Sequence, residues 1–258
     1  MVVTFLAVAA GSGPSPRVSK LSVGSVTASG TAVGSGAVPA SASVQAAVTS
    51  VSQTTLRTVG VPAGVAGPTK VTGAHSLLVG ADGKPEILYV GAEYCPFCAA
   101  QRWALTVALS HFGVFSGLGT THSSSSDLYP DTPTLSFYGS TYTSTALDFT
   151  PVELATNEAV GGQYPTLQKL TSAQQAVLDT YDRAPYTSEP GAIPFIDIGN
   201  RFVMIGASYS PTVLLGKSFA QIASALSHPS SAIAQAVDGT ANLLVAAITQ
   251  ATGIHPNR

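Results

Sequence analysis

The chain holds both of its cysteines in one short motif, and this motif limits the fold and the chemistry more than any other feature. Cys95 and Cys98 form a Cys-x-x-Cys pair. Residues 87–90 read Ile-Leu-Tyr-Val behind a turn rich in Gly and Pro, which predicts a buried strand. From residue 97 to residue 112 apolar side chains recur at helical spacing, which predicts a helix. The pair therefore lies where a strand passes into the first turn of a helix.

This location favours thiolate chemistry at Cys95. Free backbone amides and the positive end of the helix dipole stabilise an anion at the start of a helix. Pro96 suits the first helical position, where no N–H is needed. Cys98 lies about one turn further along the same face, so it could resolve a mixed disulfide formed at Cys95. These positions predict a nucleophilic Cys95, a resolving Cys98 and a pair used for disulfide exchange.

Composition excludes several other classes of function. Charged residues make up 9% of the chain, the net charge is −2 and the basic residues are scattered, so we expect no nucleic acid partner. Two cysteines lack the second pair that a zinc site of this type needs. We therefore expect no metal and no cofactor beyond the redox-active Cys95–Cys98 disulfide. A metal site built from the cysteines with His111 and His122 is an alternative, although the spacing of these histidines is irregular.

The rest of the chain alternates between strand and helix patterns. Pro194 opens an apolar, β-branched run, a place that a strand tolerates at its first residue or at an edge. Further elements are expected from local patterns: a hairpin of 134–138 with 142–149, a helix behind Thr171, a strand at 202–205, and helices over 218–226 and 230–251. The sequence therefore predicts an α/β fold.

Three segments carry a resemblance to a known family. Ala92–Cys98 looks like the active-site segment of thioredoxin-fold oxidoreductases. Gly91–Trp103, Thr121–Asp127 and Ile193–Arg201 together resemble the thioredoxin-like family catalogued as domain of unknown function 929. The resemblance implies a thioredoxin-like domain over residues 58–258. That domain would have a helical and hairpin insertion between the Cys-x-x-Cys half and the proline half, and an extra C-terminal helix.

The resemblance also assigns roles around the cysteines. Pro194 matches a proline that is cis in the thioredoxin fold and faces the pair, and the backbone of Ile193 would hydrogen-bond a bound peptide. With Tyr94, Pro96 and Phe97 these residues would form the substrate-binding surface. The activity implied is thiol–disulfide exchange with protein thiols and disulfides, served by an unidentified electron donor or acceptor. The alternative is a thioredoxin-fold binding or scaffold module with an inert Cys95–Cys98 disulfide.

The enzyme interpretation makes two demands on the structure. Cys95 has to be accessible, so we expect Tyr94 and Phe97 to flank an exposed sulfur. Pro194 has to lie beside that sulfur. A deeply covered Cys95, or a Pro194 remote from it, would be reason to abandon the enzyme assignment. Trp103, by contrast, is expected to pack in the core.

Two residues are candidates for proton transfer. Glu93 is the nearest carboxylate in sequence and could take a proton from Cys98 if it were partly buried. His122 lies in a serine-rich segment and could act as a base or a proton shuttle. The simpler interpretation makes Glu93 a solvated loop residue and His122 a hydrogen-bonding loop residue.

The N-terminal region, residues 1–57, is expected to be an apolar and linker segment. Val2–Ala10 is apolar but short for a membrane span, so it is either a frayed terminus or part of a truncated anchor. The apolar pattern of Val44–Val51 allows a short helix docked on the domain. Family members of the type resembled begin with a membrane helix. This implies membrane attachment through the N-terminus and an extracytoplasmic protein, either associated with the cell membrane or secreted.

Overall fold

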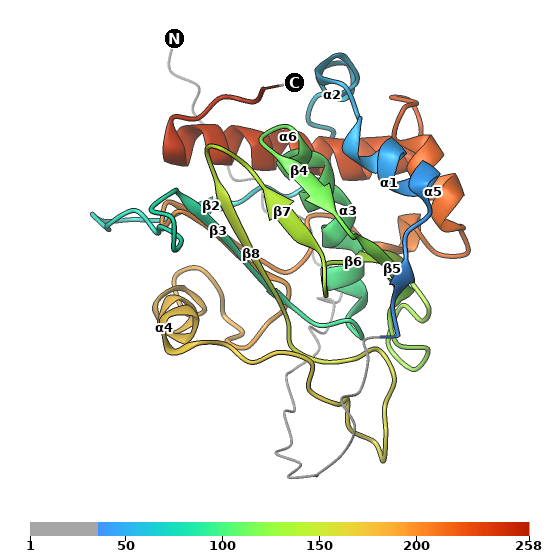
Figure 1. Cartoon of the computed structure of the whole chain (residues 1–258), viewed down its shortest axis with the longest axis horizontal. Helices are drawn as coiled ribbons and strands as arrows, with labels where there is room; N and C mark the ends of the chain where they lie inside the picture. The colour runs from blue at the N-terminus through green and yellow to red at the C-terminus, as the bar shows by residue number, and fades with distance from the viewer. Residues whose placement is uncertain (1–35, 258) are drawn as a thin grey trace.

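The computed structural model describes residues 36–257, so the expected anchor at Val2–Ala10 lies outside the described residues. Within 36–257 the chain has a mixed α/β fold with three sheets (Figure 1). The strands are β1 (Val38–Pro39), β2 (Thr69–Lys70), β3 (Glu86–Gly91), β4 (Val114–Ser116), β5 (Gly119–His122), β6 (Pro133–Ser136), β7 (Thr141–Thr143), β8 (Asp148–Glu153), β9 (Phe195–Ile198) and β10 (Phe202–Ile205). The helices are α1 (Ala42–Thr49), α2 (Gln53–Val59), α3 (Pro96–Ser110), α4 (Ser172–Tyr181), α5 (Phe219–Ala225) and α6 (Ala232–Thr252), with a 3-10 turn at Pro211–Val213.

The main sheet has the strand order β2-β10-β9-β3-β8. Its strand β3 is parallel to β8 and antiparallel to β9, and β10 is antiparallel to both β9 and β2. Tyr89 of β3 pairs with Pro151 on one side and with Ile196 on the other. Because β3 has a neighbour on each side and is covered on both faces, its apolar residues run without a polar alternation. The expected strands at 87–90 and 202–205 are therefore confirmed.

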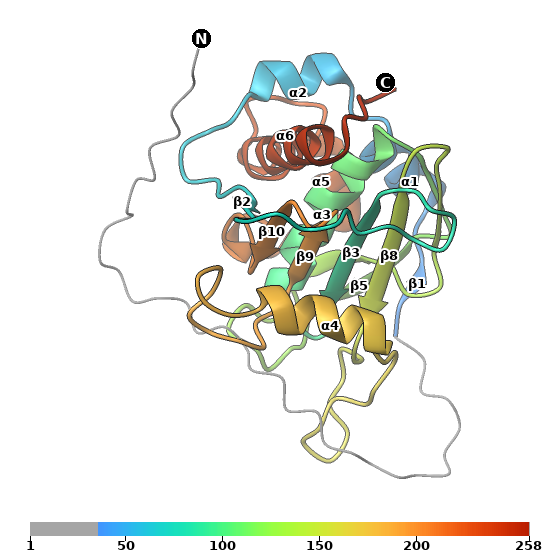
Figure 2. The ribbon, with the colours of Figure 1, turned by 90° about the vertical axis from the view of Figure 1, so that its left-hand side faces the viewer.

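Helices cover both faces of the main sheet. Leu88 and Val90 point to the side where Val177 and Tyr181 of α4 pack. Ile87 and Tyr89 point the opposite way and join the larger core, which includes α3 and α6. Figure 2 shows α4 on one side of the sheet and α3 and α6 on the other. The side-chain alternation of β3 thus divides the interior into two apolar layers.

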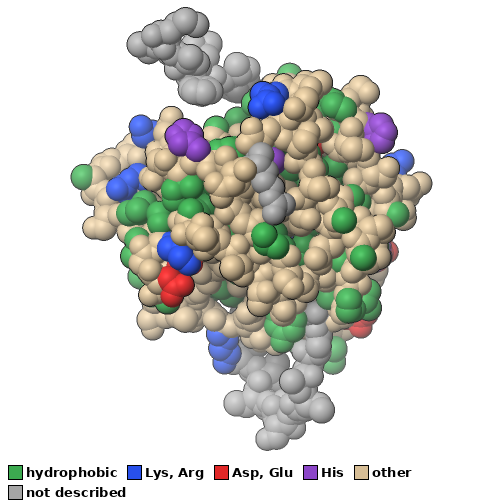
Figure 3. All heavy atoms as spheres, turned by 45° about the horizontal axis from the view of Figure 1, so that its top comes forward, with side chains coloured by type: hydrophobic (Ala, Val, Ile, Leu, Met, Phe, Trp, Pro, Cys, Tyr) green, Lys and Arg blue, Asp and Glu red, His purple; other side chains and the backbone are tan. Residues whose placement is uncertain are grey.

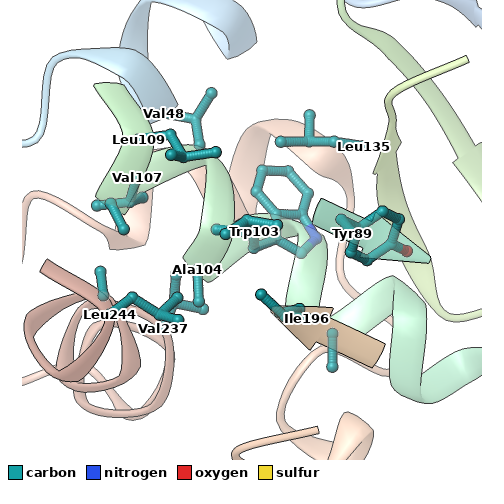
Figure 4. Packing of buried hydrophobic residues seen from close by; sticks show 14 of the residues in the cluster. Val48, Tyr89, Trp103, Ala104, Val107, Leu109, Leu135, Ile196, Val237 and Leu244 are labelled. Carbon is teal, nitrogen blue, oxygen red and sulfur yellow. The ribbon is translucent and has the colours of Figure 1, made fainter. Parts of the chain in front are cut away.

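Trp103 of α3 is central to the larger layer. It is fully buried, and its indole Nε1 donates a hydrogen bond to the carbonyl of Pro133 at 3.0 Å. Figure 4 shows the ring between Tyr89 and Leu135, with Ile196 of β9 nearby. The expectation that Trp103 packs in the core is confirmed. Removing such a side chain by Trp→Ala substitution costs about 3–5 kcal/mol in typical cores.

The long helix α6 is apolar because it packs, chiefly against α3. It is the one helix of the described region with the length and hydropathy of a membrane span, and 56% of that apolar window is buried inside the protein. Val237, Leu244 and Ile248 all belong to the larger core. The helix ends at Gly253, whose positive φ of 74° suits a residue without a Cβ. The expected C-terminal helix is therefore present as a core element.

The region before residue 58 contributes to the same core. Helix α1 begins behind the capping hydroxyl of Ser41, and α1 buries Val44 and Val48. Helix α2 is fastened to α6, where the Asn242 side chain donates to the carbonyls of Leu56 and Gly60, each at 2.7 Å. A short docked helix was expected from Val44–Val51. The packing, however, extends the compact unit across the boundary placed at residue 58.

The expected hairpin of 134–138 with 142–149 is wrong. Strand β6 pairs with β5, β7 pairs with β4, and the two strands belong to different small sheets. Residues 148–153 form β8, an edge strand of the main sheet. The local alternation identified extended chain correctly, but strand partners depend on distant segments that a local pattern does not encode.

Candidate active site

The two cysteines lie at the start of α3, as the sequence predicts. Cys95 is the N-cap of the helix, and its Sγ accepts a hydrogen bond from the backbone N–H of Cys98 at 3.3 Å. Pro96 occupies the first helical position. Both cysteines are free thiols in the structure. The sulfur of Cys95 thus takes the place of a capping oxygen, where a negative charge would be stabilised by the helix.

Pro194 meets the cysteine pair from the far half of the chain. The Ile193–Pro194 peptide bond is cis, as expected. The Cys95 thiol lies 3.7 Å from the carbonyl oxygen of Ile193, within hydrogen-bonding range for sulfur. Beyond it, the Pro194 carbonyl accepts from the N–H of Gly206 at 2.8 Å, which fixes the segment to the end of β10. Of the two demands that the enzyme interpretation makes, the proximity of Pro194 is met.

The second demand, an exposed Cys95, is not met. The exposed fraction of Cys95 is 0%, so the expectation of an exposed sulfur is wrong. The sulfurs lie in a small apolar cluster with Tyr94, Phe97 and Ile193. Tyr94 and Phe97 flank the pair as expected, but other residues complete the cover.

Two tyrosines from surface loops complete this cover. The ring of Tyr164 stacks on Tyr94 with 4.2 Å between centroids and 16° between planes. Tyr129 meets Phe97 edge to face at 5.7 Å. The Tyr164 hydroxyl donates to the Ser124 hydroxyl at 2.7 Å, which joins the two loops. We call this pair, Tyr129 and Tyr164, the tyrosine cover. It is attached to loops and to no helix or strand of the main sheet.

Glu93 lies two residues before Cys95 and is fully buried. Its Oε1 accepts from the Ser136 hydroxyl, whereas its Oε2 has no hydrogen-bond partner in the described part of the chain. Burial raises the pKa of Glu93 to about 7, while the nearby positive charge of Arg102 opposes the rise. The interpretation of Glu93 as a solvated loop residue is therefore wrong. A buried carboxyl that titrates near neutral pH suits proton transfer.

Arg102 is the cation of this site, and the sequence reading missed it. Its Nε and Nη2 donate to the two carboxylate oxygens of Glu153 at 2.8 and 2.7 Å. Nη2 also donates to the carbonyl of Ala92 at 2.8 Å and lies 3.9 Å from Oε2 of Glu93. All three charged side chains have an exposed fraction of 0%. The available signal was an arginine one helical turn after Cys98, on the side of α3 that carries the pair.

Cys98 is buried at the inner side of the pair. Burial raises the pKa of the Cys98 thiol well above its ordinary value, and the neighbouring Cys95 adds to the rise. The charge of Arg102 and the backbone of Ala92 act in the opposite direction. Removing the Cys98 proton at neutral pH therefore requires an acceptor, or a stronger influence of the guanidinium.

The two histidines do not join the site. His122 is exposed, and its ring lies 4.9 Å from the ring of Phe219 on α5. It borders a polar pocket of about 520 Å³ formed with residues 123–126 and 157–159 and with Asp131. His111 is buried at the opposite end of α3. Among residues 36–257 no three His, Cys, Asp or Glu side chains are grouped to hold a metal ion, so the alternative four-ligand site is not assembled.

Comparison with known proteins gives one match. Residues 78–176 match the family model described as Domain of unknown function (DUF929). The matched region contains the cysteine pair, Arg102 and Glu153, and it ends before Pro194. No curated protein and no solved structure matches the chain significantly. The match supports the relationship to the DUF929 family that the sequence motifs suggest.

Proposed function

We propose that this chain is a thiol–disulfide oxidoreductase that exchanges disulfides with protein substrates through Cys95 and Cys98. The observation that carries the proposal is the position of the Cys95 sulfur, at the start of α3 and 3.7 Å from the carbonyl of Ile193. At the start of α3 the sulfur accepts a hydrogen bond from the backbone N–H of Cys98. The contact with Ile193 places backbone hydrogen-bonding groups beside the sulfur, where an extended peptide could pair with them.

A thioredoxin-like core is part of this proposal. Strand β3, helix α3 and the parallel strand β8 form one half, and the antiparallel pair β9 and β10 forms the other. The four strands lie in the order β10-β9-β3-β8. Helix α4 and the loop that carries Tyr164 lie between the halves in sequence. This arrangement supports the fold implied by the motif resemblance.

The chemistry that we propose takes place in two exchanges. The Cys95 thiolate attacks a substrate disulfide, a new S–S bond forms at Cys95, and one substrate thiolate leaves. Cys98 then loses its proton and attacks the Cys95 sulfur, which forms the Cys95–Cys98 disulfide and releases the second substrate thiolate. The substrate is reduced by two electrons and the dithiol is oxidised. An external thiol donor restores the dithiol, and the reverse sequence would oxidise substrates.

Glu93 is the proposed proton acceptor for Cys98. It is fully buried, its Oε2 lies 3.9 Å from Nη2 of Arg102, and its pKa of about 7 leaves a substantial carboxylate fraction at neutral pH. His122 is not proposed for this role, because its ring lies against Phe219 on the surface. Tyr94, Pro96, Phe97, Ile193 and Pro194 remain the proposed substrate contacts.

Because Cys95 is completely buried, the proposed enzyme has to move part of its structure before a substrate can reach the sulfur. In the proposed enzyme, the loops of the tyrosine cover move aside and a peptide replaces Tyr164 on Tyr94. The second candidate function, a binding or scaffold module with an inert cysteine pair, is favoured by that same burial. The two candidates differ in whether Cys95 reacts in the folded protein.

We extend the proposal to the setting. Disulfide exchange with protein substrates suits an oxidising, extracytoplasmic compartment, with the protein attached to the membrane through its N-terminus or secreted. An electron donor or acceptor would complete the cycle. A nucleic acid partner is not proposed, since the net charge is −2 and, in the view of Figure 3, the Lys and Arg side chains lie apart from one another.

The test compares wild type with single-cysteine variants in an insulin-reduction assay under dithiothreitol. Cys95→Ser is expected to lose all activity above the uncatalysed rate. In Cys98→Ser, Cys95 is expected still to attack the substrate disulfide. The resulting mixed disulfide with the substrate should accumulate until a reducing agent cleaves it. Ala246→Ser on the exposed side of α6 is the matched control and should behave as wild type. If wild type shows no turnover and Cys98→Ser traps no partner, the binding-module candidate is the better one.

A further inference from the structure

We propose that Arg102 is the positioning residue of the resolving step and that Glu153 holds it in place. The guanidinium of Arg102 would stabilise the Cys98 thiolate and set how readily Glu93 takes the Cys98 proton. This inference rests on the proposed oxidoreductase function and deepens it. Neither Arg102 nor Glu153 has a part in the substrate-binding surface.

Arg102 is held in one orientation by three kinds of contact. It forms two parallel hydrogen bonds with Glu153 of β8, at 2.8 and 2.7 Å. It donates to the carbonyl of Ala92 at 2.8 Å and to the hydroxyl of Thr134 at 3.3 Å. Removing an arginine from water costs several kcal/mol unless its donors are satisfied, so this set of partners is needed for burial. The fork geometry fixes the positive charge of a residue that lies four positions after Cys98 on α3.

One cation faces several acidic groups here. Glu153 approaches from β8, Glu93 follows β3, and the ring of Tyr89 on β3 lies 5.9 Å from Cζ of Arg102. Cys98 and Cys95 belong to the start of the same helix. Strand β6 contributes only the uncharged hydroxyls of Thr134 and Ser136.

Glu153 neutralises most of the charge of Arg102. The part of the Arg102 charge that Glu153 leaves uncompensated stabilises one further negative charge much better than two, because like charges in a buried site repel each other strongly. Glu93 and Cys98 are the two groups that can carry this charge. Their proton equilibria are therefore linked through Arg102, and Glu153 sets the strength of the link.

The resolving step then conserves the charge of the site. The proton passes from the Cys98 sulfur to the Glu93 carboxylate, and the negative charge moves from Glu93 to Cys98. The Cys98 thiolate attacks Cys95, the intramolecular S–S bond forms, and the substrate thiolate leaves with the electron pair of the broken bond. Arg102 lies near the charge both before and after the proton moves, so no cation has to be recruited.

The experiment isolates the resolving step with 5,5′-dithiobis(2-nitrobenzoate). Attack by Cys95 releases one nitrothiobenzoate and leaves a second one as a mixed disulfide, which attack by Cys98 then releases. Stopped-flow absorbance gives the rate of this second release as a function of pH. Because the second release is intramolecular, its rate does not depend on reagent entry past the tyrosine cover.

Glu153→Gln is the decisive variant. It keeps an oxygen acceptor for Arg102 but removes the competing charge, so Glu93 and Cys98 both ionise more readily. The midpoint of the pH–rate profile should fall by about one pH unit, and the rate at pH 6 should rise about fivefold. Arg102→Gln should shift the midpoint upward and slow the second release at pH 7 about tenfold or more. If Arg102→Gln does not fold, Glu153→Gln decides the question alone.

Asp238→Asn is the matched control, because it removes another buried carboxyl outside the site and should leave both releases unchanged. If the pH–rate profile of the second release is the same in Glu153→Gln as in wild type, the proposed role of Arg102 is overturned. This holds even if both nitrothiobenzoate releases still occur. Absence of the second release in wild type would instead count against the oxidoreductase itself. The two failures are therefore distinguishable.

Discussion

Two buried carboxyl groups of this protein show what burial alone does and what an active site adds. Glu93 lies two residues before Cys95 and Asp238 lies on α6, and both have an exposed fraction of 0%. Burial raises the pKa of Glu93 to about 7 and that of Asp238 to about 8. Arg102 lies 3.9 Å from Glu93, whereas within residues 36–257 neither carboxylate oxygen of Asp238 has a hydrogen-bond partner.

The comparison shows that a raised pKa does not by itself identify a carboxyl group as functional. Asp238 is shifted further than Glu93 and has burial as its single cause. Glu93 combines burial with opposing charges from Arg102 and Glu153, and the same Arg102 acts on the Cys98 thiol that has to lose a proton. Function is therefore assigned here on the arrangement of neighbours.

The largest expected difference between these two carboxyls is kinetic. Glu93→Gln should slow the release of substrate by Cys98 about 100-fold at pH 7, because the amide cannot accept the proton. Asp238→Asn should leave that rate within about twofold of wild type. Single-turnover assays of the mixed disulfide at Cys95 measure both rates. Equal effects of the two substitutions would remove the distinction drawn here.

A smaller effect is expected at the tyrosine cover. Tyr164→Ala removes the ring stacked on Tyr94 and the hydrogen bond to Ser124, so the folded protein should react with iodoacetamide at Cys95 about tenfold faster. Tyr164→Phe keeps the ring and should give an intermediate rate. Tyr138→Ala, at an exposed tyrosine outside the cysteine cluster, is the control. Mass spectrometry of the alkylated peptide measures each rate, and an unchanged rate in Tyr164→Ala would mean that these loops do not limit access.

The smallest effect concerns stability and pH. The Asp238 pKa is 3.8 in the unfolded chain and about 8 in the folded protein, so the folded state binds more protons between these values. Its contribution to stability is therefore complete below pH 3.8 and is lost as the pH rises through about 8.

The amide of Asp238→Asn cannot ionise. Between pH 4 and pH 7 the free energy of unfolding of this variant should therefore rise by about 1–3 kcal/mol relative to that of wild type. Urea unfolding at both pH values measures the gain. In this variant the free energy of unfolding should still fall with rising pH because of Glu93 and Asp197, whose pKa values are also raised to about 7. A variant with the pH dependence of wild type would contradict the assignment to Asp238.

Local patterns in the sequence predicted those parts of the molecule that local chemistry decides. The apolar run at 87–90, the helical spacing after Phe97 and the capping residue Thr171 correctly located β3, α3 and α4. Pro194 was matched to its place beside Cys95 by motif resemblance, and the contact with Ile193 confirms that proximity. These features depend on residues within one element or one motif.

The features that were missed depend on segments far apart in the chain. Cys95 belongs to an apolar cluster against which Tyr129 and Tyr164 pack, from loops that follow two other strands, through contacts with Phe97 and Tyr94. Arg102 is paired because β8 places Glu153 next to it, 51 positions away in sequence. Charged residues are usually solvated, so a local reading favours an exposed Glu93 and gives no reason to expect a buried ion pair.

The most direct test of the central claim is a redox titration of the folded protein. Equilibration with glutathione buffers, acid quenching and mass spectrometry give the fraction of Cys95–Cys98 disulfide at each potential. An exchanging pair predicts a reversible two-electron transition at pH 7 with a midpoint between about −270 and −120 mV. Cysteines that stay reduced across this range, and react only after unfolding, would contradict the proposed oxidoreductase.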